Sequence, residues 1–396
     1  MFVTTSSQAS NFSMRTITVI FIFLLIAVSV SPLCLGQQKN IIGYFPSWKW
    51  RDKNALMTFD KIPFGKLTII DYAFWHPLTD GSIAGIDTVG DGLNLWGKNS
   101  RPSLVELAHQ HHVRIMLSIG GWDDSYNFPA VAASESLRVA FSHSCVDVIK
   151  KFDLDGIDID WEFPELTEHH GMPGDKYNYT LLMRDVRDSL ESYGHQIGKH
   201  LLLSAALPAS EKELSHFEID SVAEIFDMLN VMTYDYNGSW SPISGFNAPL
   251  YSWRSDDSLH NVDASFKLYT EQLQIPSSKI NLGIPFYGHS FAHCITLNSP
   301  HKGDDTTLFP NVDVFYYDIA GHFDKYRQWN DSAKVPYLVV PGENTLISYD
   351  DDESVALKAQ YVLDHHAGGV MIWEITGDYL GNDSNPLLDV IYSKLK

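Results

Sequence analysis

Residues 155–162 read DGIDIDWE, and this stretch decides which fold the sequence predicts. On a β-strand, alternate side chains project from one face, so Asp158, Asp160 and Glu162 share a face while the isoleucines and the tryptophan between them share the other. Neighbouring acids on that face lie about 6–7 Å apart along the strand and repel one another when all are ionised. We therefore expect at least one raised pKa, and a proton shared between the two inner acids.

A row of buried acids lowers stability, and two kinds of chemistry would explain it. A hard metal ion would use the carboxylates as ligands, but such ions usually recruit further oxygen ligands from neighbouring loops. General acid catalysis needs a carboxylic acid that stays protonated near neutral pH. Glu162 ends the strand, where barrel enzymes carry their chemistry, so the pattern favours Glu162 as that acid, with Asp160 placed to hydrogen-bond it.

Short apolar runs rich in strand-forming residues recur along the chain, and amphipathic stretches separate them. This alternation predicts an α/β protein, and eight runs favour a closed (β/α)8 TIM barrel over an open doubly wound sheet. The expected strands are 41–45, 67–74, 113–119, 156–161, 201–207, 228–233, 280–285 and 369–373. The clearest expected helices are 103–112, 135–151, 176–193, 266–273 and 353–365.

The regular spacing of the apolar runs is interrupted between the seventh and the eighth, where more than eighty residues separate Pro285 from Gly369. A connection of that length exceeds an ordinary loop. Residues 288–348 contain short aromatic runs and turn signals, and we expect them to form a small α+β insertion. The catalytic barrel, with this insertion inside it, is expected to span 37–396.

Residues 1–36 are expected to be a secretory signal peptide. Arg15 precedes an apolar run, 17–30, and the segment ends in Leu35-Gly36. The run is shorter than the roughly 20 residues that a membrane-spanning helix needs. This segment predicts a secreted, extracellular protein with no membrane attachment once the signal is removed.

The composition narrows the choice of partners. The formal net charge is −21, and so acidic a surface disfavours binding to nucleic acid or to an anionic membrane. Aromatic residues make up 13% of the chain, which is compatible with a cleft where ring faces stack on sugars. We expect a monomer with no nucleic-acid partner.

At residues 155–162 the chain resembles glycoside hydrolase family 18, the chitinases and chitinase-like proteins. The family's strand signature, Asp-Gly-x-Asp-x-Asp-x-Glu, is met there without a gap. Further stretches resemble family motifs in the expected order. They are SIGGW at 118–122, MTYD at 232–235, GIPFYG at 283–288 and GVMIW at 369–373.

The resemblance implies a retaining, substrate-assisted hydrolysis of β-1,4 bonds between N-acetylglucosamine units, in which the 2-acetamido carbonyl of the substrate attacks the anomeric carbon. Glu162 would protonate the leaving oxygen and then activate water. Asp160 would orient the acetamido N–H, and Asp158 would tune Asp160. Tyr234 would hydrogen-bond the acetamido carbonyl, and Asp235 would contact the sugar. No metal and no cofactor are expected.

The resemblance also implies which residues hold the sugar chain. Trp373 is expected to form the floor beneath the distorted sugar, and Trp122 to line the cleft. The remaining expected contacts are Tyr44, Phe74, Gly121, Met232 and Tyr287. His289 stands where the family often carries an arginine, and we assign it no role from the sequence.

Three functions stay open at this point. The first is a chitinase, with chitin or N-acetylglucosamine oligosaccharides as the partner. The second is an endo-N-acetylglucosaminidase acting on N-glycans, which shares the carboxylate strand. The third is a non-catalytic chitin-binding lectin. The presence of Glu162 favours an enzyme, and Tyr234 together with the expected insertion leans toward a chitinase.

Overall fold

The computed structural model describes residues 38–51, 58–96 and 102–396. The expected signal peptide, 1–36, lies outside these residues. Among the described helices, none combines the length and the apolar character needed to cross a membrane.

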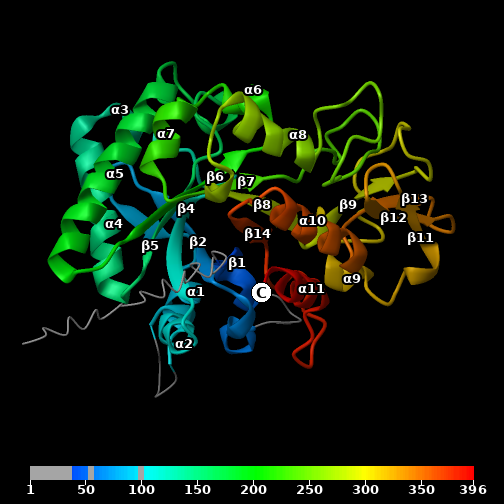
Figure 1. Cartoon of the computed structure of the whole chain (residues 1–396), viewed down its shortest axis with the longest axis horizontal. Helices are drawn as coiled ribbons and strands as arrows, with labels where there is room; N and C mark the ends of the chain where they lie inside the picture. The colour runs from blue at the N-terminus through cyan, green and yellow to red at the C-terminus, as the bar shows by residue number, and fades with distance from the viewer. Residues whose placement is uncertain (1–37, 52–57, 97–101) are drawn as a thin grey trace, which may run out of the picture. The chain divides into compact units, whose positions relative to one another are not determined.

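Eight parallel strands close into a barrel (Figure 1), which confirms the predicted fold. In chain order they are β1 (Asn40–Pro46), β2 (Ile69–Pro77), β4 (Arg114–Gly120), β5 (Gly156–Asp160), β6 (Leu202–Pro208), β7 (Met228–Met232), β8 (Ile280–Pro285) and β14 (Gly369–Trp373). β1 pairs with β14 on one side and with β2 on the other, and these two pairings close the ring. A short extra strand, β3 (Ile83–Gly85), runs antiparallel to the end of β2.

The strand residues alternate between two apolar clusters. On β5, Ile157 and Ile159 face outward into the larger core between the barrel and its helices. A smaller cluster fills the barrel interior with Tyr44, Met116, Met371 and their neighbours. Asp158 and Asp160 occupy the interior face of β5, as the period of two predicts.

Helices cover the outside of the barrel, with α3, α4 and α5 over β4 and β5 (Figure 1). The helices are α1 (Thr88–Asn94), α2 (Leu104–Gln110), α3 (Phe128–Ala133), α4 (Glu135–Phe152), α5 (Asp175–Ile197), α6 (Glu211–Leu214), α7 (Ile219–Ile225), α8 (Val262–Lys267), α9 (Tyr316–Ile319), α10 (Asp352–Asp364) and α11 (Pro386–Leu395). The expected helix at 266–273 is instead the end of α8 followed by a π-helical turn, Leu268–Gln272.

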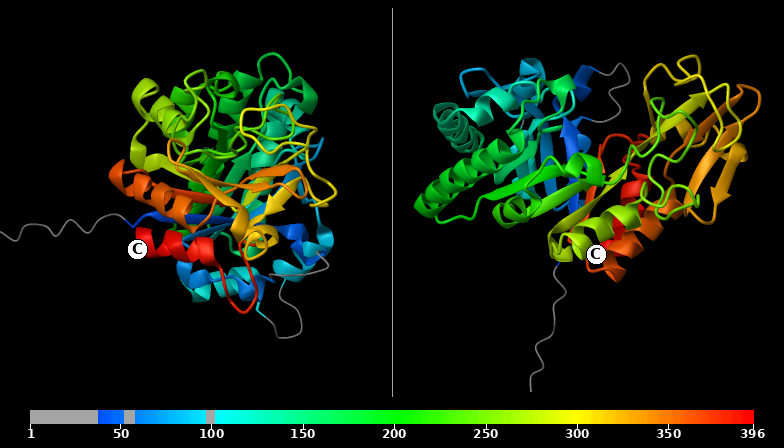
Figure 2. Two further views of the ribbon diagram at one scale, coloured as in Figure 1. Left: turned by 90° about the vertical axis from the view of Figure 1, so that its right-hand side faces the viewer. Right: turned by 90° about the horizontal axis from the view of Figure 1, so that it is seen from above.

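Between β8 and β14 the chain forms a second sheet of five antiparallel strands, in the order β10-β9-β13-β12-β11. These are β9 (Tyr287–Ala292), β10 (Asp313–Phe315), β11 (Arg327–Asn330), β12 (Val335–Val340) and β13 (Thr345–Ser348). Only Phe286 separates β8 from β9, so the second sheet begins at the carboxyl edge of the barrel. Figure 2 shows the sheet beside the barrel, with α10 leading back toward β14.

β4 and β5 approach each other closely at their carboxyl ends because two glycines lie there. The Gly121 N–H donates to the carbonyl oxygen of Asp160 at 2.7 Å. Gly120 has φ 116°, and a Cβ on it would lie 2.1 Å from the same oxygen. The position of Asp160 therefore depends on the missing side chain at Gly120.

We predict that Gly120→Ala destabilises the protein by about 3 kcal/mol or more, because the left-handed backbone and the clash with Asp160 both carry a cost. The midpoint of urea unfolding measures this. Gly342→Ala is the control, since a Cβ at Gly342 meets no atom within 4 Å. Equal midpoints for the two variants would contradict the prediction.

Candidate active site

Asp158 lies at the centre of the barrel interior and is surrounded by donors. Its Oδ2 accepts hydrogen bonds from the hydroxyls of Tyr44 and Ser118, each at 2.7 Å. Its Oδ1 accepts from the hydroxyl of Ser204 at 2.6 Å and from the amide of Asn230 at 3.4 Å. Burial raises the pKa of Asp158, and these four hydrogen bonds act in the opposite direction.

Asp160 lies two residues nearer the carboxyl end of β5, and its carboxyl group has fewer hydrogen-bond donors than that of Asp158. The residue is 4% exposed, and its Oδ1 has no hydrogen-bond partner among the described residues. Burial raises its pKa well above the ordinary value, and the charges of Glu162, Asp158 and Asp71 add to the shift. Its surroundings therefore favour the protonated form of this carboxyl group.

Asp160 Oδ1 makes no hydrogen bond to Glu162 or to any other described residue, and the expected bond between the two carboxyl groups stays a prediction for the other oxygen of Asp160. Side chains two positions apart on a strand start about 6–7 Å from each other, so a direct bond requires one of them to turn along the strand. The unpaired Oδ1 of Asp160 leaves that carboxyl group able to bind a substrate atom instead.

Glu162 lies two residues beyond the end of β5 and is mostly shielded from solvent. Burial, followed by the negative charges of Asp235 and Asp123, raises the pKa of Glu162 to about 8. At neutral pH this side chain is therefore a protonated acid. It lies at the carboxyl end of the barrel strands, where the sequence places the general acid.

Asp71, on β2, is an interior acid that the sequence analysis missed. The residue is fully buried, and neither carboxyl oxygen has a hydrogen-bond partner in the part of the chain that the structure describes. Burial and then the charge of Asp158 raise its pKa well above the usual range, while Arg114 acts in the opposite direction. A lone acid inside the apolar run 67–74 was the available signal.

Tyr234 and Asp235 approach the site from the residues that follow β7. Among the described residues, the Tyr234 hydroxyl has only the weak acceptor Met371 Sδ, at 3.8 Å. Burial raises the pKa of Tyr234 well above its ordinary value, with Asp160 the next cause, so the phenol stays a donor. Asp235 accepts from the Tyr287 hydroxyl at 2.7 Å and from His289 Nε2 at 2.8 Å.

His289 lies on β9 of the second sheet, with a side chain that is only 2% exposed. Burial lowers its pKa, but the hydrogen bond and charge of Asp235, followed by the charges of Asp313 and Asp304, outweigh this effect and raise it overall. Asp313, opposite His289 on β10, has a pKa raised by burial to about 6. His289 therefore links Asp235 to the second sheet.

The aromatic residues fall into buried and exposed sets. Phe74 and Trp373 stack with ring centroids 5.5 Å apart. Tyr44 is 1% exposed, so it lies beneath the carboxyl groups and presents little surface to a ligand. Trp122 is 51% exposed and Trp240 59% exposed.

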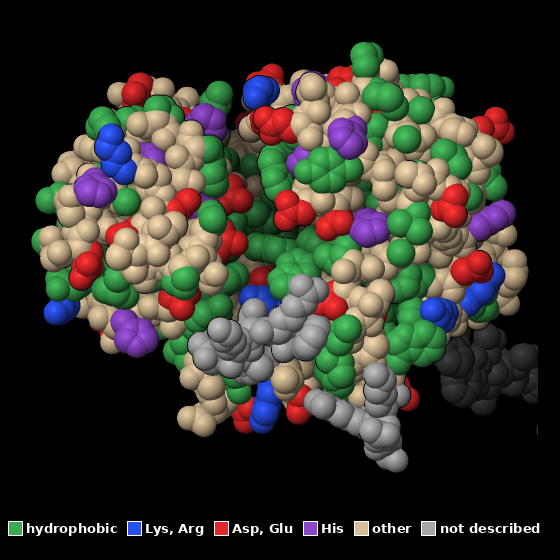
Figure 3. Space-filling model, turned by 180° about the vertical axis from the view of Figure 1, so that it is seen from behind, with side chains coloured by type: hydrophobic (Ala, Val, Ile, Leu, Met, Phe, Trp, Pro, Cys, Tyr) green, Lys and Arg blue, Asp and Glu red, His purple; other side chains and the backbone are tan. Residues whose placement is uncertain are grey.

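The surface is hollowed beside the second sheet. Figure 3 shows a groove between this sheet and the barrel, with hydrophobic side chains along its floor and acidic side chains at its sides.

Two other residues that were expected to contact the sugar lie beside apolar side chains. Gly121 lies against the ring of Phe74, and Met232 is half-buried beside the interior cluster.

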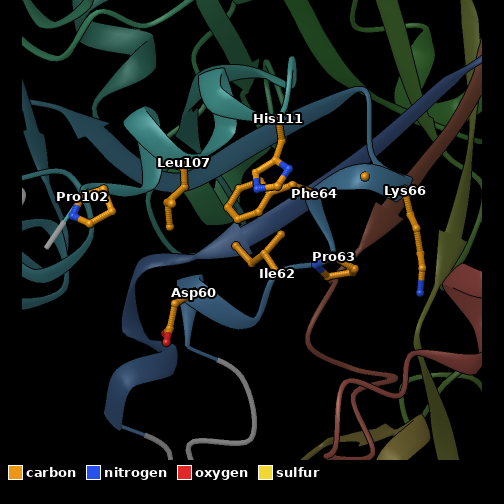
Figure 4. A pocket seen from close by; sticks show the side chains of 9 residues that line it. Asp60, Ile62, Pro63, Phe64, Lys66, Pro102, Leu107 and His111 are labelled. Carbon is orange, nitrogen blue, oxygen red and sulfur yellow. The ribbon is translucent and has the colours of Figure 1, made fainter.

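A separate pocket of about 480 Å³ lies at the opposite end of the barrel (Figure 4). Its walls include Ile62, Phe64 and Leu107, and the rings of Phe64 and His111 stack across it at 5.3 Å. These residues precede β2 and β4, whereas the acids described above lie toward the carboxyl ends of the strands. The pocket is therefore not part of the candidate active site.

Within residues 38–51, 58–96 and 102–396, no three His, Cys, Asp or Glu side chains are grouped as metal ligands. Of the interior acids, Asp158 is surrounded by hydroxyl and amide donors from neighbouring strands. Chemically, the arrangement can donate a proton from Glu162 and accept a hydrogen bond at Asp160.

Comparison with known proteins gives consistent matches. The sequence profile described as glycosyl hydrolases family 18 matches residues 40–378. Chitinase A1 of Niallia circulans is 32% identical over 86% of this chain, and the match spans 56% of that protein. Chitinase 1 of Aphanocladium album is 32% identical over 86% of this chain and 82% of its own length. The solved structure of chitinase ChiA74 from Bacillus thuringiensis aligns with a TM-score of 0.81 at 29% identity, covering 91% of this chain and 70% of that one.

We predict that Glu162→Gln changes how stability depends on pH. The folded pKa of about 8 lies above the ordinary 4.5, so between these values the folded protein holds a proton that the unfolded chain has released. The contribution of Glu162 to stability is fully present below about pH 4.5 and is lost as the pH rises toward 8. Relative to wild type, Glu162→Gln should gain at most about 1.4 kcal/mol per pH unit over this window.

Urea unfolding at several pH values between about 5 and 8 tests this. Asp80→Asn is the control. The Ser82 hydroxyl, which does not titrate, donates to Asp80 and lowers the pKa of this carboxyl group, so the difference from wild type should stay constant over the same window. A constant difference for Glu162→Gln as well would contradict the raised pKa.

Proposed function

The chain belongs to family 18 of the glycosyl hydrolases, whose profile matches residues 40–378, and from this membership we propose that it is a chitinase. The proposed reaction is hydrolysis of β-1,4 bonds between N-acetylglucosamine units with retention of configuration. The observation that carries the proposal is Glu162, an acid with a pKa raised to about 8 at the carboxyl end of β5. The names of the two chitinase relatives support the same substrate class.

In the proposed first step, Glu162 gives its proton to the glycosidic oxygen as the bond to the anomeric carbon breaks. The 2-acetamido carbonyl oxygen of the substrate forms the new bond to that carbon, so the enzyme supplies no nucleophile. Glu162, now a carboxylate, then accepts a proton from the water that opens the cyclic intermediate. A pKa near the working pH suits a group that must act first as acid and then as base.

Asp160 is proposed to orient the acetamido group. Its Oδ1 is buried, unpaired and free to accept the acetamido N–H. Asp158 is held by Tyr44, Ser118, Ser204 and Asn230, which favour its charged form. A negative charge at Asp158 helps Asp160 to retain its own proton until substrate binds, since two adjacent charges in a low-dielectric interior repel.

Tyr234 and Asp235 are proposed to hold the reacting sugar from the β7 side. The Tyr234 hydroxyl, which donates weakly to the Met371 sulfur, would exchange this contact for the acetamido carbonyl oxygen. The side chain of Asp235 is 44% exposed and retains lone pairs that can accept a hydrogen bond from a sugar hydroxyl.

Trp373, stacked on Phe74, would support the sugar ring from below.

The surroundings of the site belong to the same proposal. Chitin or its oligosaccharides would lie in the groove between the barrel and the second sheet, over Trp122 and Trp240, with Gly121, Met232 and Tyr287 nearby. We propose that 288–348 form an insertion domain of the barrel, that 1–36 direct secretion, and that the enzyme acts extracellularly as a monomer. The reaction as proposed uses no metal and no cofactor.

We predict that Glu162→Gln lowers the turnover of chitotetraose by at least about 100-fold, because the general acid supplies roughly 10²–10⁴ of the rate. Chromatography of the released products measures the turnover. Glu165→Gln, three residues further along the chain, removes a carboxylate that bonds His216 and should keep near-native turnover. Near-native hydrolysis by Glu162→Gln would show that the proton comes from another group.

We predict that the wild-type protein cleaves chitotetraose and leaves the N-glycans of a high-mannose glycoprotein intact. Tyr234 and the wall formed by the second sheet favour the linear substrate. Assaying both substrates side by side separates the three functions, since an endo-N-acetylglucosaminidase would release the glycan and a lectin would cleave neither. Binding of chitotetraose without any product would refute the enzymatic proposal.

A further inference from the structure

His169 is a buried histidine in direct contact with the backbone of Glu162. It ends a short 3-10 turn, Thr167–His169, in the loop that follows β5, and it is 3% exposed. Its Nδ1 is hydrogen-bonded to the carbonyl oxygen of Glu162. Because a carbonyl oxygen can only accept, Nδ1 must carry the hydrogen.

The peptide groups on both sides of the Glu162 Cα are held by side chains. The Glu162 N–H donates to the Ser125 hydroxyl oxygen at 3.0 Å. The Ser125 hydroxyl in turn donates to the carbonyl oxygen of Gly121 at 2.9 Å. Ser125 and His169 thus hold the backbone of the acid from two different loops.

The ring of His169 also supports the exposed aromatic residues of the β4 loop. It meets the ring of Trp122 edge to face, with centroids 4.5 Å apart and an angle of 71°. It meets the ring of Tyr126 in the same way, at 5.0 Å and 62°. Trp122 is 51% exposed and Tyr126 39% exposed, so the far sides of both rings are available to a ligand.

We propose that His169 is a positioning residue that sets the distance between a sugar stacked on Trp122 and the acid Glu162. Its Nδ1–H fixes the Glu162 peptide, while its ring fixes Trp122. One side chain therefore sets the position of Trp122 relative to Glu162. This inference rests on the proposed function. A displacement of about 1 Å in a reacting group can lower the rate on the order of 100-fold, which is why the hydrogen bond matters for turnover.

Two substitutions separate the two roles. His169→Phe keeps an aromatic ring against Trp122 but removes the donor to Glu162. His169→Asn keeps an N–H donor near the position of Nδ1 but removes the ring. His170→Asn is the matched control, because His170 is exposed and its ring contacts Tyr126 at 5.1 Å without contacting Trp122.

We predict that His169→Phe lowers kcat on chitotetraose roughly ten- to hundredfold with KM within about twofold of wild type. His169→Asn should keep kcat within about threefold and raise KM roughly fivefold, because the edge-to-face contact that orients Trp122 is lost. His170→Asn should match wild type in both constants. Thermal unfolding of each variant shows whether it is folded, and a loss of stability alone would not divide kcat from KM in this way.

The proposal is overturned if His169→Phe keeps the kcat of wild type, or if the Phe and Asn variants lose kcat equally. Should His169→Phe not fold, His169→Ala takes its place, and a higher kcat in His169→Asn than in His169→Ala is then required. Wild-type turnover is measured first. Its absence contradicts the proposed chitinase function, whereas wild-type turnover with an unaffected His169→Phe contradicts only the role of His169.

Discussion

Burial of several carboxyl groups in one barrel interior is the constraint on which the rest of the site depends. Asp71, Asp158 and Asp160 are almost completely removed from water, and Glu162 is shielded at the mouth. A buried carboxylate without donors is costly, so such a group keeps its proton instead. Only Asp158 receives four donors, and the acids on either side of it have raised pKa values with few or no partners. The uneven supply of donors thus favours the charged form at Asp158 and the protonated form at its neighbours.

The barrel supplies those donors through register. Ser118 on β4 and Ser204 on β6 are the direct pairing partners of Asp158 on β5, and both face the interior. Small hydroxyl residues fit on either side of a central carboxylate where larger side chains would collide. Gly120 lies two residues beyond Ser118 on β4 and pairs with Asp160. Because Gly120 has no side chain, β4 can approach the backbone of Asp160 closely. The acid row is therefore built from the neighbouring strands as much as from its own.

The sequence predicted the barrel well because alternating and apolar runs report directly on strands, and β5 bears the pattern most clearly. It predicted less about contacts between strands, since Ser204 and Asn230 reach Asp158 only through a pairing register that no local pattern contains. Asp71 was missed because a single acid in an apolar run has no local partner to mark its role. The expected bond from Asp160 to Glu162 stays a prediction, since same-face side chains start about 6–7 Å apart along a strand and one of the two must turn to form it.

The second sheet influences the pKa of Glu162 electrostatically. The charge of Asp235 is one cause of the raised pKa of Glu162, and Asp235 is held in place by Tyr287 and His289 of β9. An arginine at position 289 would keep a fixed positive charge, whereas a histidine has a charge that depends on its acidic neighbours, here Asp235 and Asp313. The net charge facing Glu162 from this side is therefore set by the histidine and its two carboxyl groups together. The pKa of Glu162 therefore depends on charges from both the barrel and the second sheet. The acids of the row themselves lie only on or beside the barrel strands β2 and β5.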